Sequence, residues 1–270
     1  MGVTDPDLAG TLALPRAEDP GPAPDQPSTP HPEQGPPRGR RRWPRRLLRG
    51  GLALLVIAGA ILASAEIATP PVTSAPALVT AIDRAHHSEP VRVDPSWRVA
   101  RAIVAAEDAG FYGNHGIDVP GMIRGLWGRL TGHDLGGSTI TEQLAKAIYE
   151  NGRTGLVNRV AEVALALKLE GHYGKDAILS MYMSAIYYGH GFYGVLAASE
   201  GYFGLPPGRL SWGQAALLAG LPQAPSLLDP LRHLAIARER QGYVLNRLVA
   251  TGVLSRSQAA AAGRAPLALR

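Results

Sequence analysis

One apolar run behind a cluster of arginines constrains this chain more than any other feature. Residues 38–49 hold seven Arg and no acid, and residues 50–65 carry no charge at all. Apolar residues on both sides extend the run toward the roughly 20 residues that a membrane-spanning helix needs. Arg49 and Glu66 lie near its ends, where charge is tolerated. We therefore predict a transmembrane signal anchor over residues 50–68, with the Arg-rich juxtamembrane block 38–49 on its cytoplasmic side.

Two export signals are alternatives to an uncleaved anchor. The small residues Ala63-Ser-Ala65 fit the cleavage pattern of a signal peptide. Such peptides are about 15–30 residues long, however, and this one would have 65. A twin-arginine signal is the weaker alternative, because the Arg pairs lack the rest of that motif. With an uncleaved anchor, everything after residue 70 lies outside the cytoplasm.

The segment before the arginines has the composition of a disordered chain. Residues 1–37 contain ten Pro, six acids and one Arg, so they cannot bury enough apolar surface to offset their conformational entropy. We predict a disordered, Pro-rich cytoplasmic tail, with a Pro-rich docking ligand as the alternative. The basic block is typical of a membrane flank rather than of a nucleic-acid site. The absence of Cys excludes disulfides, thiol nucleophiles and zinc–thiolate sites.

The rest of the chain predicts an all-α domain over residues 95–270, after a Pro-containing linker at 69–94. Apolar residues recur at helical spacing and never alternate over a sustained stretch. The motif Gly189-His-Gly-Phe-Tyr-Gly194 matches a dinucleotide fingerprint, but no strand precedes it, so we interpret it as a turn between helices. The His residues show no metal-ligand spacing. The helical stretches are 97–107, 142–149, 157–169, 177–188, 212–221 and 234–249.

Three segments carry residue types suited to catalysis. Glu107-Asp108 ends an apolar helical run, where a carboxylate against an apolar wall can exchange a proton with a substrate. Gly136-Gly-Ser-Thr leads into a helix whose first amides suit an anion such as phosphate. Arg159 and Glu162 share one helix face among apolar residues. The alternatives are an acidic helix end on the surface, a well-capped helix and an exposed charged stripe.

Taken in order, these segments resemble the peptidoglycan glycosyltransferases, which include monofunctional biosynthetic transglycosylases and the glycosyltransferase domain of penicillin-binding proteins. The first resembles E-D-x-x-F-x-x-H-x-G, the second G-G-S-T-[IL]-T-Q-Q-L-x-K-N and the third R-K-x-x-E. Because the chain stops at Arg270, we expect the monofunctional kind. The resemblance runs on through Lys175-Asp-Ala-Ile-Leu, Met181-Tyr-Met, Tyr188-Gly189, Tyr202-Phe-Gly204 and Ala215–Pro225.

The resemblance implies a lysozyme-like fold with a small membrane-associated subdomain, which residues 116–135 would supply. It implies polymerisation of lipid II into glycan strands at the outer face of the bacterial cytoplasmic membrane, with release of undecaprenyl pyrophosphate. Glu107 would be the general base and Glu162 would assist near the leaving group. The implied apolar membrane contacts are Met122, Ile123, Leu126 and Trp127, and the implied substrate-binding residues are Asp108, Phe111, Arg124, Ser138, Thr139, Gln143, Lys146 and Arg159.

The resemblance also implies partners and a cofactor. The partners are lipid II, the growing glycan strand, the membrane and other cell-wall synthesis proteins, without nucleic acid. A divalent cation (Mg²⁺ or Mn²⁺) would assist at the pyrophosphate, with no metal site held by the protein and no organic cofactor.

Several positions depart from the family pattern. Asn114 stands at the motif His, Glu142 replaces the first Gln of the pair, and Asn158-Arg159 replaces Arg-Lys. Both Glu residues and Lys146 remain, so we expect a working but divergent enzyme. One alternative is a catalytically impaired, membrane-anchored protein that binds lipid II or acts as a scaffold. A hydrolase of similar fold is another, although it would not need a pyrophosphate site. The remaining departures are Ala147 for Asn, Ser180 for Glu, Ser184 for Asn and Gln214 for Glu.

Overall fold

The computed structural model of the chain describes residues 45–131, 137–149 and 155–270. The predicted tail at 1–37 and most of the Arg-rich block lie outside these ranges. Within them the secondary structure is helical, and the nearest approach to a sheet is one isolated antiparallel bridge between Tyr187 and Tyr193. The all-α prediction is confirmed. Residues 48–270 form one unit with a common core.

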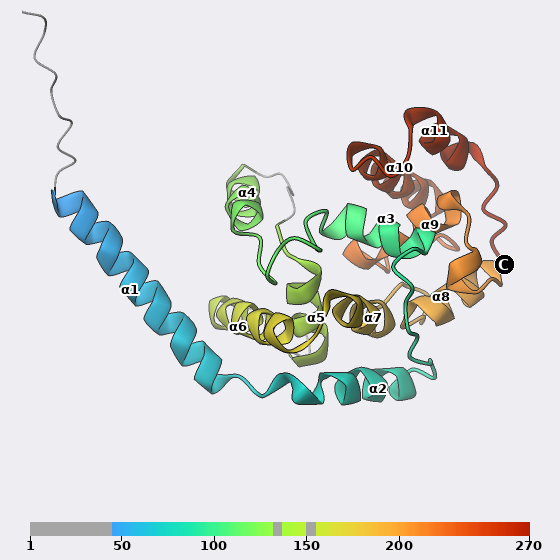
Figure 1. Cartoon of the computed structure of the whole chain (residues 1–270). Coiled ribbons are helices and arrows are strands. Elements are labelled where there is room, and N and C mark those ends of the chain that lie inside the picture. Colours follow the sequence, from blue (N-terminus) through green and yellow to red (C-terminus); the bar gives the residue numbers. More distant parts are fainter. Residues whose placement is uncertain (1–44, 132–136, 150–154) are drawn as a thin grey trace, which may run out of the picture. The chain divides into compact units, whose positions relative to one another are not determined.

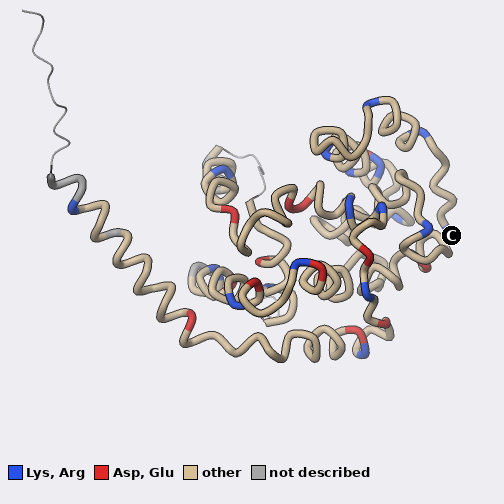
Figure 2. The backbone as a smooth tube through the Cα atoms, viewed as in Figure 1, with Lys and Arg blue, Asp and Glu red and all other residues tan. Residues whose placement is uncertain are grey.

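Helix α1 (Arg45–Ala68) contains the predicted anchor. Its stretch Arg49–Ala68 has a mean hydropathy of 2.1, and none of it is buried against the rest of the chain. Twenty helical residues extend about 30 Å, the thickness of a bilayer's hydrocarbon core. Figure 2 shows the long uncharged course of this helix between its two charged ends. The helix is therefore long and apolar enough to span a membrane.

The segment that we expected to be a linker differs from that expectation, because much of it is folded. It contains a short 3-10 helix (Val72–Ser74) and helix α2 (Ala75–Ala85). Ala75 and Val79 lie one turn apart on the buried face of α2, and Pro76 is compatible with a first helical turn. The Pro residues that suggested a linker therefore mark the start of a helix. The residues of this segment that enter the core are Val72, Ala75, Val79 and Val93.

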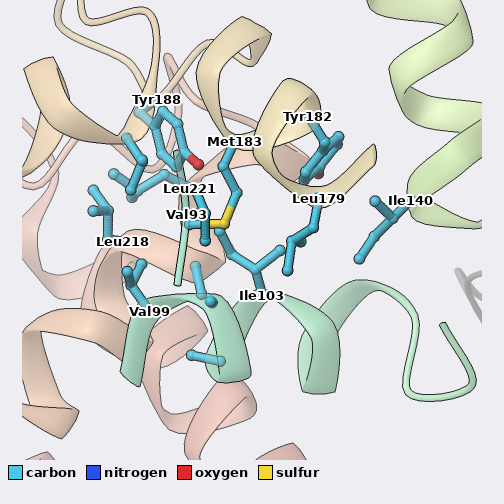
Figure 3. Close-up of a cluster of buried hydrophobic side chains, with 14 of the residues drawn as sticks. Val93, Val99, Ile103, Ile140, Leu179, Tyr182, Met183, Tyr188, Leu218 and Leu221 are labelled. Atoms are coloured by element: carbon cyan, nitrogen blue, oxygen red, sulfur yellow. The ribbon is translucent and has the colours of Figure 1, made fainter. Parts of the chain in front are cut away.

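All six predicted helical stretches are confirmed as helices. In Figure 1, α5, α6 and α7 are neighbours, and α3, α9 and α10 pack against one another. Figure 3 shows where these groups meet, with Ile103 of α3 facing Leu179 of α7 and with Leu218 of α9 near Tyr188. The six helices are α3 (Arg98–Glu107), α5 (Ile140–Tyr149), α6 (Leu156–His172), α7 (Lys175–Ala185), α9 (Trp212–Gly220) and α10 (Leu234–Ala250).

Shorter elements complete the described fold. The 189–194 motif is a turn between α7 and α8, as predicted, with Gly189 and Gly194 at positive φ. Gln214, which stands where the family often has Glu, completes a capping box with Ser211 at the start of α9. The remaining elements are α4 (Val119–Leu130), α8 (Val195–Phe203), α11 (Arg256–Arg264) and the 3-10 helices Pro207–Arg209 and Leu221–Gln223.

Candidate active site

Glu107 is the last residue of α3, where the helix leaves the core. Its carboxylate Oε2 accepts a hydrogen bond of 2.8 Å from Nε2 of Gln143 on α5. The Gln143 carbonyl oxygen in turn accepts a hydrogen bond of 2.9 Å from the Tyr182 hydroxyl on α7. Three helices thus fix the orientation of one carboxylate through neutral donors.

The tyrosines near Glu107 keep their protons. Tyr182 and Tyr188 are fully buried, and burial raises the pKa of both phenols, with the charge of Glu107 adding to the effect. Tyr182 is therefore a hydrogen-bond donor at any ordinary pH. We did not assign Tyr182 a role from the sequence. A phenol hydroxyl inside an otherwise buried helical stretch was the feature that could have indicated one.

Glu162 on α6 has a charged neighbour instead. Nη1 of Arg159 lies 2.5 Å from Glu162 Oε2, and its Nη2 donates to the Ser138 hydroxyl at 2.9 Å. The Glu162 side chain is 6% exposed and that of Arg159 is 31% exposed. The guanidinium can therefore reach solvent while it holds a buried acid and the loop before α5.

The amides at the start of α5 are occupied by side chains of the protein. The Thr139 amide donates to Glu142 Oε2 (2.8 Å), and the Glu142 amide donates back to the Thr139 hydroxyl (3.1 Å), which is a capping box. The Ile140 amide donates to Asp108 Oδ2 at 3.3 Å. The expectation that these amides suit a substrate anion is therefore replaced by its alternative, a well-capped helix.

Asp108 belongs to a polar network beneath this helix start. It is 8% exposed, and the Asn114 amide donates to both of its carboxylate oxygens, at 3.0 and 2.9 Å. The Asn114 carbonyl accepts from Lys175, which also pairs with Glu170 at 2.8 Å. Burial raises the pKa of Asp108, while these hydrogen bonds and the Lys175 charge oppose that rise. Asn114, at the motif His position, thus joins Asp108 at the end of α3 to Lys175 at the start of α7.

Two glycines let the loops around the site pack closely. A Cβ on Gly116 (φ +90°) would lie 2.6 Å from the Glu170 side chain. A Cβ on Gly137 (φ +145°) would lie 2.5 Å from the carbonyl oxygen of Gly121 and 3.4 Å from Cα of Gly125, both on α4. Gly137 therefore presses directly against the backbone of α4, next to Ser138.

Two of the predicted substrate-binding residues, Phe111 and Arg124, contact groups other than the two carboxylates. Phe111 is fully buried in the core, with the Lys175 ammonium 4.5 Å from its ring centre. Arg124 is exposed on α4 and pairs with Asp118 at 3.2 Å. Lys146 is exposed on α5, and within the described residues it joins none of the contacts above.

Helix α4 presents an apolar face to solvent. Val119, Ile123 and Trp127 lie one turn apart and are 53%, 65% and 65% exposed. Met122 is half-buried, and the side chain of Leu126 lies outside the described part of the structure. Ile123 and Trp127 are thus available as the apolar contacts that we predicted.

The described carboxylates and imidazoles do not form a metal centre. Among the described residues, no group of three or more His, Asp or Glu side chains is arranged to hold a metal ion. The divalent cation at the pyrophosphate stays a prediction.

Comparison with known proteins gives one consistent assignment. The family model described as Transglycosylase matches residues 76–249. A putative transglycosylase of Cupriavidus necator is 38% identical over 222 residues, which are 81% of this chain and 95% of the relative. Penicillin-binding protein 1A of Mycobacterium tuberculosis is 40% identical over 60% of this chain and 20% of its own length. This chain thus spans about a fifth of such penicillin-binding proteins.

A solved structure is also similar. The crystal structure of penicillin-binding protein 1A from Haemophilus influenzae has 30% sequence identity to this chain. The similarity covers 48% of this chain and 16% of that chain, with a TM-score of 0.35.

Proposed function

Because the chain belongs to the transglycosylase family, we propose that it is a peptidoglycan glycosyltransferase of bacterial cell-wall synthesis. It polymerises lipid II into glycan strands and releases undecaprenyl pyrophosphate. The observation that carries this proposal is the pair of acids beside α5. Glu107 accepts a hydrogen bond from the amide of Gln143, and Glu162 holds the cation of Arg159. An oriented acid and a cation held by a second acid suit a reaction in which one end loses a proton and the other gains negative charge.

Glu107 acts as the general base. It accepts the proton of the acceptor sugar's 4-hydroxyl while that oxygen forms its bond to the donor's anomeric carbon, on the face opposite the departing pyrophosphate. Gln143 keeps one carboxylate oxygen oriented, and Tyr182 holds Gln143 in turn. A sugar hydroxyl takes the place that water has in an inverting glycosidase.

Arg159 and Ser138 act at the leaving group. The bond from the anomeric carbon to the pyrophosphate breaks, and its electron pair leaves with the phosphate oxygen. A guanidinium that reaches solvent stabilises this developing charge. Glu162 holds Arg159 in place from its buried side. Lys146, exposed on the same helix as Gln143, supplies a second cation, and a divalent cation bound by the pyrophosphate would supply further positive charge.

The other predicted binding residues mainly hold neighbouring groups in place. Asp108 and Thr139 fix the start of α5 through its backbone amides and through the Gly116 carbonyl. Phe111 supports Lys175 from the core. Arg124 belongs to the exposed helix α4, and there it meets lipid head groups rather than the reacting atoms.

The membrane is the surface on which this reaction takes place. Helix α1 serves as a single-pass anchor, the Arg-rich block keeps its preceding end in the cytoplasm, and the catalytic domain lies outside. Ile123 and Trp127 of α4 enter the interface, where the lipid-linked substrate is found. Other cell-wall synthesis proteins are the proposed partners in the same plane.

A second function is favoured by one observation. Glu142 stands where the family has Gln, close to the proposed pyrophosphate site. If its carboxylate were charged there, it would weaken the binding of an anionic leaving group. The chain would then be an impaired relative that binds lipid II or acts as a scaffold.

Polymerisation of lipid II by the purified full-length chain in detergent tests the proposal. The rate is measured with and without Mg²⁺ or Mn²⁺, for the native chain, for Glu107→Gln and for Glu200→Gln, an exposed acid on α8. We expect Glu107→Gln to lower the rate by about 10²–10⁴-fold and Glu200→Gln to leave it unchanged. A Glu107→Gln rate close to native would exclude Glu107 as the base. Binding of lipid II without product in the native chain would favour the scaffold.

A further inference from the structure

Glu142 is a buried acid that has no part in the proposed chemistry. It is 1% exposed and lies on the first turn of α5. One of its oxygens, Oε2, accepts the Thr139 amide at 2.8 Å. The other, Oε1, is buried and has no hydrogen-bond partner among the described residues. A buried carboxylate with a single donor is poorly stabilised, whereas a neutral acid needs fewer partners.

Charged groups of both signs face Glu142. Asp108 at the end of α3 and Arg159 and Glu162 on α6 are the charged groups that face it. The Arg159 guanidinium already binds Glu162 and Ser138. Glu142 therefore faces two acids, Asp108 and Glu162, and one cation that is engaged elsewhere. Burial is the main cause that raises the pKa of Glu142, with Glu162 and Asp108 adding to it and Arg159 opposing it.

We propose that Glu142 is a positioning residue that works as a neutral carboxylic acid, in place of the Gln of the family pattern. In its neutral form Glu142 still accepts the hydrogen bond of the Thr139 amide in the capping box. Ser138 then keeps its hydrogen bond with Arg159, and the site gains no extra negative charge. When the pH rises, the proton leaves to solvent. The new carboxylate then competes with Glu162 for Arg159 and repels an anionic substrate. The effect on substrate rests on the proposed function, but the protonation state does not.

Thermal unfolding of the full chain in detergent tests the protonation without any activity. The Tm is measured from pH 4 to pH 9 for the native chain, Glu142→Gln and Glu170→Gln. A folded pKa above the unfolded value of about 4.3 means that the acid's stabilising effect is present at low pH and is lost as the pH rises through the folded pKa. We therefore expect the native Tm to fall relative to that of Glu142→Gln over this window.

Glu170→Gln is the matched control, because Glu170 is a poorly exposed acid that pairs with Lys175. Its substitution should lower the Tm at neutral pH, the opposite of Glu142→Gln. A native Tm that stays level with, or rises above, that of Glu142→Gln as the pH increases would overturn the proposal. If Glu142→Gln fails to fold, infrared spectra of the native chain decide. A buried neutral acid shows a carboxylic C=O band at neutral pH that disappears at high pH, and absence of the band would overturn the proposal.

Kinetics then test the effect on substrate. The KM for lipid II of the native chain should rise about tenfold across the titration, and that of Glu142→Gln should stay level. Parallel KM profiles would overturn the electrostatic part of the proposal. If the thermal result holds but neither protein makes glycan at any pH, the proposed function fails while the neutral Glu142 stands.

Discussion

The two acids of the site, Glu107 at the end of α3 and Glu162 on α6, both lie near α5, but their neighbours differ in kind. Glu107 receives its hydrogen bond from the uncharged Gln143, and buried tyrosines stand behind it. Glu162 is paired with Arg159. The described neighbours therefore differ in charge, because an amide orients Glu107 and a guanidinium holds Glu162. The contrast teaches that two acids of one site can receive different tasks from the groups around them.

Removal of the cation should have the largest effect. Arg159→Met leaves Glu162 buried without its partner, and we expect a loss of about 2 kcal/mol in the free energy of unfolding. The expected loss of polymerisation rate is about 100-fold or more. Urea unfolding and initial rates measure these effects, with the exposed Arg256→Met as the control. A native-like stability for Arg159→Met would mean that the pair contributes nothing and that the contrast is false.

Loss of the hydrogen bond to Glu107 should lower the rate less than loss of the cation. Gln143→Leu removes the donor to Glu107 and the acceptor of Tyr182, so a buried hydroxyl loses its partner, at a cost of about 1–3 kcal/mol. We expect kcat to fall by about tenfold while the KM for lipid II changes little. An increase in KM with an unchanged kcat would show that Gln143 binds substrate instead of orienting the base.

The smallest effects are expected from removal of the hydroxyl groups of the two buried tyrosines. Tyr182→Phe removes one neutral hydrogen bond and should cost about 1 kcal/mol of stability and a few-fold in kcat. The Tyr188 hydroxyl is buried without a hydrogen-bond partner in the described part of the chain, so Tyr188→Phe should be neutral or slightly stabilising. Equal losses in the two variants, measured by urea unfolding, would mean that burial matters and the Gln143 contact does not.

The helices of the folded part could largely be predicted from sequence, because apolar residues at helical spacing mark the faces that they bury. Helix α2 was missed, since its Pro-rich start reads as a linker until its packing is known. The short helix α11 was missed too, because its Ala-rich sequence shows no apolar stripe.

The site was predictable only in part. Glu107, Gln143, Arg159 and Glu162 occupy recognisable motifs. The contacts between motifs were not predicted, because pairs such as Asn114 and Lys175 join residues 61 positions apart. Spacing along the chain cannot reveal such a pair. The same limit explains why Phe111, which belongs to the same motif as Glu107, is a core residue here.

The close contact between Gly137 and α4 has a mechanical consequence. No side chain separates the two backbones, because Gly137 lies against Gly121 and Gly125. A displacement of α4 is therefore not absorbed by rotating side chains and moves Gly137 directly. The next residue, Ser138, holds Arg159. In the proposed mechanism, a force on the exposed apolar face of α4 would therefore reach the Arg159 guanidinium through the peptide unit that joins Gly137 to Ser138.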